Sequence, residues 1–402
     1  MSQELSSRVQ RIKPSPTLAV AARAEELKSQ GKNIISLSVG EPDFDTPDHI
    51  KEAAIKAIRD GFTKYTAVDG TKGLKQAIVD KLARENQLTY ALNQVLVSCG
   101  AKHTIFNLFA AVLNAGDEVI IPAPYWVSYP DIALLADATP VIIETNLAAH
   151  FKITPEQLSK AITPKTRLVM LNSPSNPTGS AYTRKELQAL GEVLKKHPQI
   201  LVASDDIYEH TLWSQEPFSN ILMACPELYD QTVVINGVSK AYAMTGWRIG
   251  YAAGPQKVIA AMTKIQSQST SNPTSIAQVA AQAALNGDQS CIKTMTKAFK
   301  ERHDFVYNEL RKIPGIECEP CDGTFYIFPN VSAIIKQAGM KDDIVFSEYL
   351  LNEAEVALIP GSAFGAPGYI RISYATSMEK LQEAMKRMQT AIAKLQTAQA
   401  SA

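Results

Sequence analysis

The chain has 402 residues, of which 40 are lysine or arginine and 40 are aspartate or glutamate, so its formal net charge is zero. This balance excludes the overall basic surface with which nucleic-acid binders and anionic-membrane binders hold phosphates, so any basic function must come from a local site. The length is too great for one small core, and it predicts one large and one smaller domain.

The N-terminal segment gives no sign of targeting. Residues 1–15 lack the apolar stretch of a secretory signal, and no run of 18 apolar residues that could cross a bilayer occurs anywhere in the sequence. We therefore expect a cytoplasmic protein that neither enters a membrane nor binds nucleic acid.

The chain up to about residue 270 alternates apolar strands with amphipathic helices. This alternation predicts an α/β fold with a mostly parallel sheet covered on both faces, and it assigns residues 47–290 to a large domain. Ligands of such sheets lie outside the carboxyl ends of the strands, and the lack of a GxGxxG motif gives no reason to expect a dinucleotide. Helices are expected at 15–30, 48–59, 71–84, 102–113, after 126 and from 184, and strands at 34–39, 94–98, 118–122, 140–144, 167–171, 200–204, 232–235 and 248–253.

The pattern changes from about residue 274 onward. Helical segments run to residue 313, and short strands then alternate with helices, which is typical of an α+β arrangement. We assign residues 291–402, together with residues 1–46, to a smaller domain. Its strands are expected at 315–318, 324–329, 356–360 and 369–374, and its later helices at 345–353 and 377–395.

The five cysteines include one close pair, Cys318 and Cys321. A CxxC motif occurs in redox and metal sites, but a zinc site of this kind needs a second such pair, which the sequence lacks. We interpret both residues as unpaired thiols in a loop, which predicts no metal site. Reduced thiols also favour the cytoplasm.

Residues 236–251 follow the apolar run at 232–235 and contain two cations, Lys240 and Arg248. A lysine just past a buried strand is partly desolvated, which lowers its pKa and frees its amine as a nucleophile. An arginine suits a two-pronged grip on phosphate instead. A nucleophilic lysine beside a phosphate clamp is what a pyridoxal phosphate Schiff base requires. From this stretch alone, an ordinary surface lysine and a structural arginine remain the alternative.

Gly100, Ala101 and Lys102 open a helix directly after a strand. Small residues there leave backbone N–H groups exposed at the positive end of the helix dipole, which forms an anion site. Lys102 adds a cation to it. A plain strand-to-helix turn is the alternative.

Asp205 ends a predicted buried strand, and Tyr208 follows three residues later. A carboxylate in that position is costly unless it is paired, and a pyridinium nitrogen is a suitable partner. Tyr208 could then hydrogen-bond a phenolic oxygen on the same ring. Asp206 points the other way on an extended chain and is the weaker candidate. The alternative is a helix-capping aspartate and a core tyrosine.

Three further side chains have a functional and a plain interpretation. Asn176 stands either in a simple turn or where its amide can donate to a ring oxygen. Trp126 offers a flat face for a pyridine ring, or it packs in the core. Arg371 lies in an alternating strand, and it needs a carboxylate partner if its face is inward.

Taken in order, these residues resemble the fold-type I, class-I pyridoxal phosphate-dependent aminotransferases. Within that class the chain is most similar to the bacterial and plastid aspartate aminotransferases, in the branch that includes aspartate/prephenate enzymes. The match runs from Lys13 to the helix after Arg371. The order and spacing of the motifs is far more specific than any single one. The motifs are GEPDFDTP at 40–47, GAK at 100–102, PYWVSYP at 124–130, SPSNPTG at 173–179, SDDIY at 204–208 and SK at 239–240.

The resemblance implies a homodimer with shared active sites and one role for each motif residue. Lys240 is then the covalent attachment point of pyridoxal 5'-phosphate and the carrier of the substrate proton. Asp205 pairs with the ring nitrogen, Tyr208 and Asn176 bond the phenolic oxygen, and Trp126 stacks on the ring. Pro124 and Pro177 match positions that are cis in relatives. The phosphate contacts implied are Gly100, Ala101, Ser239 and Arg248, with Tyr65 of the partner subunit.

The resemblance also implies how the amino-acid and 2-oxo-acid substrates bind. Arg371 would hold the α-carboxylate beside Gly40, with Trp126 and Asn176 facing the substrate. Lys102 would hold the distal carboxylate, with Thr17 as a second contact. We therefore expect aspartate aminotransferase activity with 2-oxoglutarate as acceptor, by a ping-pong mechanism, because a buried cation selects dicarboxylates.

Other functions stay open at this point. Prephenate is an additional or alternative acceptor, and a C–S lyase on the same fold is a further alternative. A cofactor-sensing DNA-binding regulator is disfavoured, because only about a dozen residues precede the first expected helix and the net charge is zero.

Overall fold

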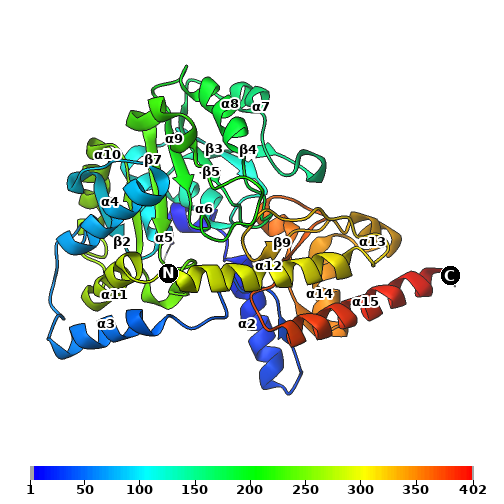
Figure 1. Ribbon diagram of the computed structural model, residues 1–402. Coiled ribbons are helices and arrows are strands. Elements are labelled where there is room, and N and C mark those ends of the chain that lie inside the picture. The colour runs from blue at the N-terminus through cyan, green and yellow to red at the C-terminus, as the bar shows by residue number, and fades with distance from the viewer. Residues whose placement is uncertain (1–3, 401–402) are drawn as a thin grey trace.

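The computed structural model describes residues 4–400. A seven-stranded sheet forms its centre, in the order β2-β8-β7-β6-β5-β3-β4 (Figure 1). The pairs among β3, β4, β5, β6 and β7 are parallel, whereas β8 pairs antiparallel with both β7 and β2. The expected mostly parallel sheet is confirmed. The strands are β2 (Val95–Ser98), β3 (Glu118–Ala123), β4 (Thr139–Glu144), β5 (Thr166–Asn172), β6 (Leu201–Asp205), β7 (Thr232–Gly237) and β8 (Gly250–Ala253).

Strand β8 begins two residues later than the sequence predicts. Arg248 has φ 56° and ψ 52°, a left-handed conformation that cannot continue an extended strand. The strand therefore starts at Gly250, where a Cβ atom would lie 2.2 Å from the backbone nitrogen of Ala101. Only glycine allows β8 to approach the start of the helix at Ala101–Val112 this closely.

Helices cover both faces of the sheet, as the uniformly apolar strands predict. Neighbouring residues of β2 show the two faces, because Leu96 packs in one core cluster while Val95 and Val97 pack in the other. The first face is covered by α5 (Ala101–Val112), α6 (Ser128–Leu135) and α10 (Gln256–Ser267). The second face is covered by α3 (Asp48–Arg59), α4 (Lys72–Asn86), α7 (Pro155–Ala161), α8 (Arg184–Leu194), α9 (Ile221–Ala224) and α11 (Ser275–Asn286).

The C-terminal elements form a second hydrophobic core with residues 35 and 37 of the N-terminal segment. A three-stranded sheet, β11-β12-β9, and a two-stranded pair, β1-β10, lie within it. The stretch 315–318 makes only a single bridge, between Glu317 and Asn330, instead of the expected strand. The domain boundaries at residues 47 and 291 stay a prediction. The elements are β1 (Ile35–Ser36), α12 (Ser290–Leu310), β9 (Tyr326–Ile327), α13 (Ser332–Gln337), α14 (Asp343–Glu353), β10 (Val356–Ala357), β11 (Ile359–Pro360), β12 (Ile370–Ser373) and α15 (Met378–Ala400).

The N-terminal segment connects both parts of the molecule. The short helix α1 (Ser7–Arg11), which the sequence did not predict, packs against α6, and Arg8 and Arg11 pair with Asp137. The next helix, α2 (Pro16–Ser29), packs against β10 and β11, and Figure 1 shows it in blue beside the orange and red C-terminal elements. Among the residues described, no helix is long and apolar enough to cross a membrane.

Candidate active site

A cavity of about 430 Å³ lies where the carboxyl ends of β5, β6 and β7 meet the second core. This is the edge at which ligands of parallel sheets bind. Among the predicted site residues, Tyr65 and Gly100 do not line the cavity. The others do, namely Thr17, Gly40, Ala101, Lys102, Trp126, Asn176, Asp205, Tyr208, Ser239, Lys240, Arg248 and Arg371.

Lys240 follows β7, and its side chain reaches into the cavity. Its ammonium group donates a hydrogen bond to the carbonyl oxygen of Gly40, and it lies 5.8 Å from the ring centroids of both Tyr208 and Phe325. Burial lowers the pKa of Lys240 to about 8, against the opposing charge of Glu41. Roughly a tenth of the amine is therefore neutral at pH 7, far more than for an ordinary lysine.

Asp205 is the last residue of β6, and its side chain is buried. It accepts a hydrogen bond of 2.6 Å from the hydroxyl of Tyr129 and one of 3.3 Å from the backbone N–H of Ile207. Burial raises the pKa of Asp205 to about 6, although both hydrogen bonds oppose the rise. Within residues 4–400 the carboxylate has no ion pair, so it can accept a cationic ligand atom.

Asp206 points away from the cavity, as expected for the next residue of an extended chain. Its carboxylate accepts hydrogen bonds from Ser204 and Asn220, at 2.7 Å and 2.6 Å. Because side chains alternate along β6, Asp205 faces the cavity and Asp206 does not.

Arg371 on β12 is a buried cation that has no carboxylate partner in the part of the chain that the structure describes. Its Nη1 atom donates to Oδ1 of Asn176 at 2.9 Å, and its Nη2 atom donates to the carbonyl oxygen of Ser38 at 2.6 Å. The Nε atom has no hydrogen-bond partner among the described residues. Burial lowers the pKa of Arg371. Such a group is stabilised when a carboxylate enters the cavity.

The hydrogen bond from Arg371 also orients Asn176. Because Oδ1 of Asn176 accepts from the guanidinium, its amide nitrogen is left to donate elsewhere. The peptide bonds before Pro124, Pro174 and Pro177 are cis. The expectation for Pro124 and Pro177 is confirmed, whereas the sequence did not predict the cis bond at Pro174.

The turn at Gly100 brings a cation to the N-terminus of α5. Gly100 has φ +88° and ψ 159° and precedes the first helical residue, Ala101. The guanidinium of Arg248 lies against Gly100, and it donates to the carbonyl oxygens of Thr245 and Cys99 at 2.9 Å and 3.3 Å. Exposed N–H groups, a helix dipole and a guanidinium together fit a phosphate.

Lys102 and Thr17 lie at the outer part of the cavity, on α5 and α2. Lys102 is exposed in the single chain, whereas the sequence interpretation assumed a buried cation. Its Nζ atom lies 5.0 Å from the ring centroid of Trp126. Burial of part of the side chain lowers the pKa of Lys102, and the charge of Arg248 lowers it further.

Tyr65 does not line the cavity of its own chain, and 91% of its surface is exposed. Ile55, Ile58 and Phe62, on α3 and just after it, are also exposed apolar side chains. A patch of this kind on a single chain is typical of a protein interface.

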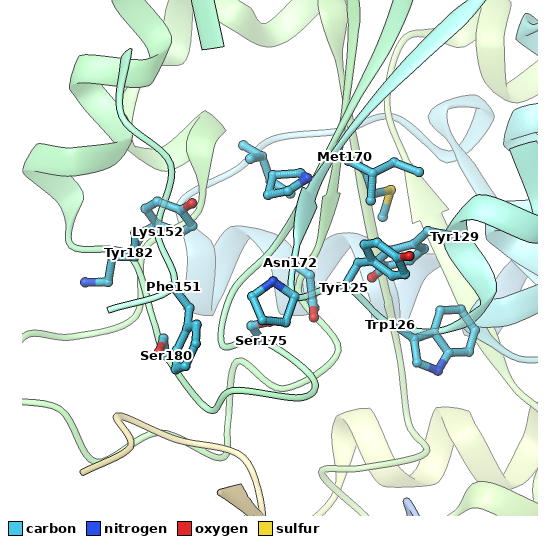
Figure 2. A pocket seen from close by; sticks show the side chains of 14 residues that line it. Tyr125, Trp126, Tyr129, Phe151, Lys152, Met170, Asn172, Ser175, Ser180 and Tyr182 are labelled. Carbon is cyan, nitrogen blue, oxygen red and sulfur yellow. The ribbon is translucent and has the colours of Figure 1, made fainter. Parts of the chain in front are cut away.

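A second, smaller cavity lies behind the wall of the first. Its volume of about 30 Å³ has room for roughly two water molecules. Figure 2 shows Tyr125, Trp126 and Tyr129 on one side of it, and Lys152 and Tyr182 on the other. Because Trp126, Tyr129 and Asn172 line both cavities, this wall is only one side chain thick.

A buried ionic cluster supports the loop that carries Tyr208. Lys81 contacts the carboxylate of Glu209, whose side chain also accepts hydrogen bonds of 2.7 Å from both Asn86 and Asn236. Burial is the largest single effect on the pKa of Glu209 and raises it, but the charges of Lys81 and His210, together with the hydrogen bonds from Lys81 and Asn86, outweigh it, so the pKa is lowered. The cluster thus fixes the backbone directly after Tyr208.

Sequence reasoning did not find two cavity residues, Tyr129 and Tyr326. Tyr129 lies one helical turn after Trp126 and holds Asp205. Tyr326 lies on β9, and its hydroxyl lies 2.9 Å from that of Tyr208. Tyr129 belongs to the PYWVSYP motif at 124–130, which could have pointed to it, whereas Tyr326 reaches the site through tertiary packing and has no local sequence signal.

Comparison with known proteins identifies close relatives. A family model described as "Aminotransferase class I and II" matches residues 32–388. The "aspartate/prephenate aminotransferase" of Nitrosomonas europaea is 61% identical, over 95% of this chain and 98% of the relative. The aspartate aminotransferase of Geobacillus stearothermophilus is 52% identical, over 95% of this chain and 97% of the relative.

Solved structures give the same result. The aspartate aminotransferase of Rhizobium meliloti matches with a TM-score of 0.94 and 47% identity, over 98% of this chain and 99% of that one. The Thermus thermophilus enzyme, solved with maleate, matches with a TM-score of 0.91 and 41% identity, over 97% of this chain and 100% of that one.

Proposed function

Because the chain belongs to the class I and II aminotransferase family, we propose that it transfers the amino group of L-aspartate to 2-oxoglutarate. The products are oxaloacetate and L-glutamate. One observation carries the proposal: the buried, unpaired guanidinium of Arg371 lines the same cavity as the amine of Lys240. A site with a carboxylate receptor beside a nucleophilic amine suits an amino acid.

The residues of the cavity fit pyridoxal 5'-phosphate as cofactor. Asp205 would hold the protonated ring nitrogen, and Trp126 would cover one face of the ring. Asn176 and Tyr208 would donate to the phenolic oxygen. When bound, the cofactor supplies an electron sink for the charge left by removal of the substrate's α-proton. The phosphate would be held by Gly100, Ala101, Ser239 and Arg248, with Lys102 as a nearby cation and Tyr65 of the partner subunit as a further contact.

The fit rests on features of the chain itself. Asp205 is a buried carboxylate that forms no ion pair within residues 4–400, and a protonated ring nitrogen would supply one. A side chain at Gly100 would fill the space of the Arg248 guanidinium, so the phosphate cradle requires glycine. Homodimer formation fits Tyr65, which is exposed and does not line the cavity of its own chain. A cytoplasmic location stays a prediction.

Lys240 would move the proton that defines the reaction. Its neutral amine would take the proton from the substrate's α-carbon. The resulting ammonium would then give this proton to a different atom of the bound substrate and cofactor. The lowered pKa, about 8, suits this work near neutral pH. Tyr129 keeps the Asp205 carboxylate in place during the transfer.

Substrate selection would be divided between two cations. Arg371 binds the α-carboxylate beside Gly40, and Lys102 with Thr17 binds the distal carboxylate. The two substrates would use the same site in turn, and the first product leaves before the second substrate binds. Such ping-pong kinetics are the expected signature of covalent catalysis, which the amine of Lys240 in this cavity would support.

Prephenate is a second amino acceptor that we propose for this site. The support is the 61% identity to the Nitrosomonas europaea protein named for it, together with Thr17 and Lys102 in the cavity. Prephenate also carries a carboxylate away from its keto acid group, which Lys102 could hold.

The proposal is tested on purified protein with pyridoxal phosphate. Aspartate should change the visible absorbance of the bound cofactor, and 2-oxoglutarate or prephenate should restore it. Lys240→Ala should still bind cofactor but lose turnover. Near-normal transamination by Lys240→Ala would refute the assignment, and pyruvate release from cystathionine without an acceptor would point to a C–S lyase instead.

A further inference from the structure

Tyr326 is a fully buried residue that lines the cavity and lies against Arg371, Tyr208 and Gly40. It lies on β9, opposite Ser373 of β12. Arg371 and Ser373 share one face of β12, so Tyr326 is the diagonal neighbour of Arg371 on the same face. The small sheet thus brings the phenol ring and the guanidinium together.

The ring of Tyr326 covers the guanidinium of Arg371. The carbon Cζ of Arg371 lies 4.4 Å from the ring centroid of Tyr326 and 5.0 Å from that of Phe364. The Nη1 and Nη2 atoms of Arg371 donate hydrogen bonds to Asn176 and Ser38, while Nε has no hydrogen-bond partner among residues 4–400. A desolvated cation is attracted to the face of an aromatic ring. The ring of Tyr326 therefore holds the guanidinium of Arg371, including its unpartnered Nε atom, in one orientation.

The hydroxyl of Tyr326 serves a different neighbour. It lies 2.9 Å from the hydroxyl of Tyr208, and each hydroxyl has a single proton to donate. If Tyr208 directs its proton into the cavity, Tyr326 must donate to the oxygen of Tyr208. A hydroxyl that accepts such a bond becomes a stronger donor itself.

Gly40 makes this arrangement possible. A Cβ atom on Gly40 would lie 2.7 Å from the hydroxyl oxygen of Tyr326, so a side chain there would displace the phenol. The carbonyl oxygen of the same Gly40 accepts the hydrogen bond of Lys240. The motif around Gly40 therefore positions both the tyrosine and the lysine.

We propose that Tyr326 is a positioning residue with two separable roles: its hydroxyl polarises and orients Tyr208, and its ring orients Arg371. The inference rests on the proposed function, because Tyr208 acts on the cofactor's phenolic oxygen and Arg371 acts on the substrate carboxylate. Tyr326 itself transfers no proton to or from substrate.

The first test removes only the hydroxyl, with Tyr326→Phe. The phenolic oxygen of the bound cofactor would carry the most negative charge once the proton that it shares with the nitrogen of Lys240 has been lost. A weaker hydrogen bond from Tyr208 to this oxygen would therefore make the loss of that proton harder. The pH at which the visible absorbance of the bound cofactor changes should rise by about half a unit or more. Tyr349→Phe is the matched control, because its hydroxyl donates to the carbonyl oxygen of Ala391 on the remote α15.

A double variant separates this role from simple packing. In a Tyr208→Phe background, Tyr326→Phe should cause no additional shift, because its effect passes through the Tyr208 hydroxyl. An unchanged absorbance titration in the single variant, or an equal shift in both backgrounds, would overturn the hydroxyl role.

The second test removes the ring, with Tyr326→Leu, and Tyr326→Met serves if the leucine variant does not fold. The KM for aspartate should rise about tenfold with either, while Tyr326→Phe should stay within about twofold of the wild type. A similar KM in all variants would overturn the ring role. If the wild type itself shows neither the absorbance band nor transamination, the proposed function fails instead.

Discussion

The guanidinium of Arg248 occupies the space next to Gly100, where a Cβ atom would come within 2.3 Å of Nη2. Gly100 also has φ +88°, a conformation that side chains rarely adopt. Two constraints therefore act at one position. The first constraint is the backbone conformation of the turn into α5. The second is the space that the guanidinium of Arg248, the expected phosphate-binding cation, occupies beside Gly100.

Gly100→Ala should separate these constraints when it is compared with Gly116→Ala. Gly116 has φ +86°, but nothing lies within 4 Å of its would-be Cβ. Both variants should lose unfolding free energy from backbone strain, roughly 1–2 kcal/mol at Gly116 and roughly 1–3 kcal/mol at Gly100, whose ψ of 159° lies in a region that is almost restricted to glycine. Only Gly100→Ala should also displace Arg248 and raise the Kd for pyridoxal phosphate, by roughly tenfold.

Absorbance titration with the cofactor and denaturation of the cofactor-free protein measure the two effects. Equal cofactor affinities in the two alanine variants would show that Arg248 does not depend on the space at Gly100.

Arg371→Lys should impair substrate binding far more than folding. Lysine cannot offer two parallel N–H groups to a carboxylate, and no carboxylate of the described chain depends on Arg371 for neutralisation. We expect kcat/KM for aspartate to fall roughly 100-fold, which corresponds to about 3 kcal/mol. Arg387→Lys on α15, whose arginine pairs with Glu355 and Glu383, is the control. A fall of the same size in both variants would contradict the assignment.

Much of the fold follows from local patterns. The helix predicted at 48–59 is α3 (Asp48–Arg59), because its apolar spacing and charged ends are intrinsic to the segment. The antiparallel direction of β8 could not be predicted. Its residues, Gly250–Ala253, are buried on both faces, and such a run looks the same whichever way the strand runs. The sequence analysis missed five helices altogether, namely α1, α7, α9, α10 and α13.

The candidate site also contains residues that the sequence predicts and residues that it does not predict. Lys240 and Asp205 follow buried strands, so the topology alone brings them to one edge of the sheet. Tyr326 lies on a short strand of the other core, and only the packing of the two cores brings it to Tyr208. The exposure of Lys102 was also beyond sequence reasoning, because it depends on surroundings distant in the chain.

Lys81→Met should be strongly destabilising, because it leaves Glu209 buried and charged without its cation. Only 1% of the Lys81 side chain and 4% of the Glu209 side chain are exposed. Breaking a buried pair from one side costs about 3–5 kcal/mol. The double variant Lys81→Met/Glu209→Gln should recover much of this loss, as measured by denaturant unfolding.

The exposed pair Lys56 and Asp60 provides the control for that experiment. Lys56→Met should leave the unfolding midpoint unchanged, since exposed pairs contribute little. A Lys81→Met variant as stable as Lys56→Met would show that the buried cluster does not hold the loop of Tyr208.

Asp205→Asn should change the pH dependence of stability in the cofactor-free protein. The pKa of Asp205 is raised by burial from an ordinary 3.8 to about 6, so the folded state holds the proton more tightly than the unfolded state. The wild type therefore loses stability as the pH rises from about 4 to about 6, by about 3 kcal/mol, because one pKa unit is about 1.4 kcal/mol. The asparagine variant lacks this loss.

We therefore expect Asp205→Asn to gain about 3 kcal/mol relative to the wild type between pH 4 and pH 8. Asp80→Asn, on the exposed side of α4, is the control. Cofactor should reverse the order at pH 8, because a protonated ring nitrogen would stabilise the Asp205 carboxylate. A constant difference between variant and wild type across this pH range would contradict the raised pKa.

Lys102→Ala tests which cation recognises the distal carboxylate. Lys102 lines the same cavity as Arg371 but lies on α5, whereas Arg371 lies on β12, so the proposal that Lys102 holds the distal carboxylate predicts an effect at the far end of a substrate. We expect kcat/KM for aspartate and 2-oxoglutarate to fall roughly tenfold to 100-fold, and that for alanine or phenylalanine to change less than about threefold. Lys257→Ala, an exposed lysine on α10, is the matched control.

Because Lys102 also lies near the N-terminus of α5, its removal could weaken the hold on phosphate, and the cofactor Kd must be measured in the same variant. Equal losses for dicarboxylic and monocarboxylic substrates, with a raised cofactor Kd, would place Lys102 in the phosphate site instead of the substrate site.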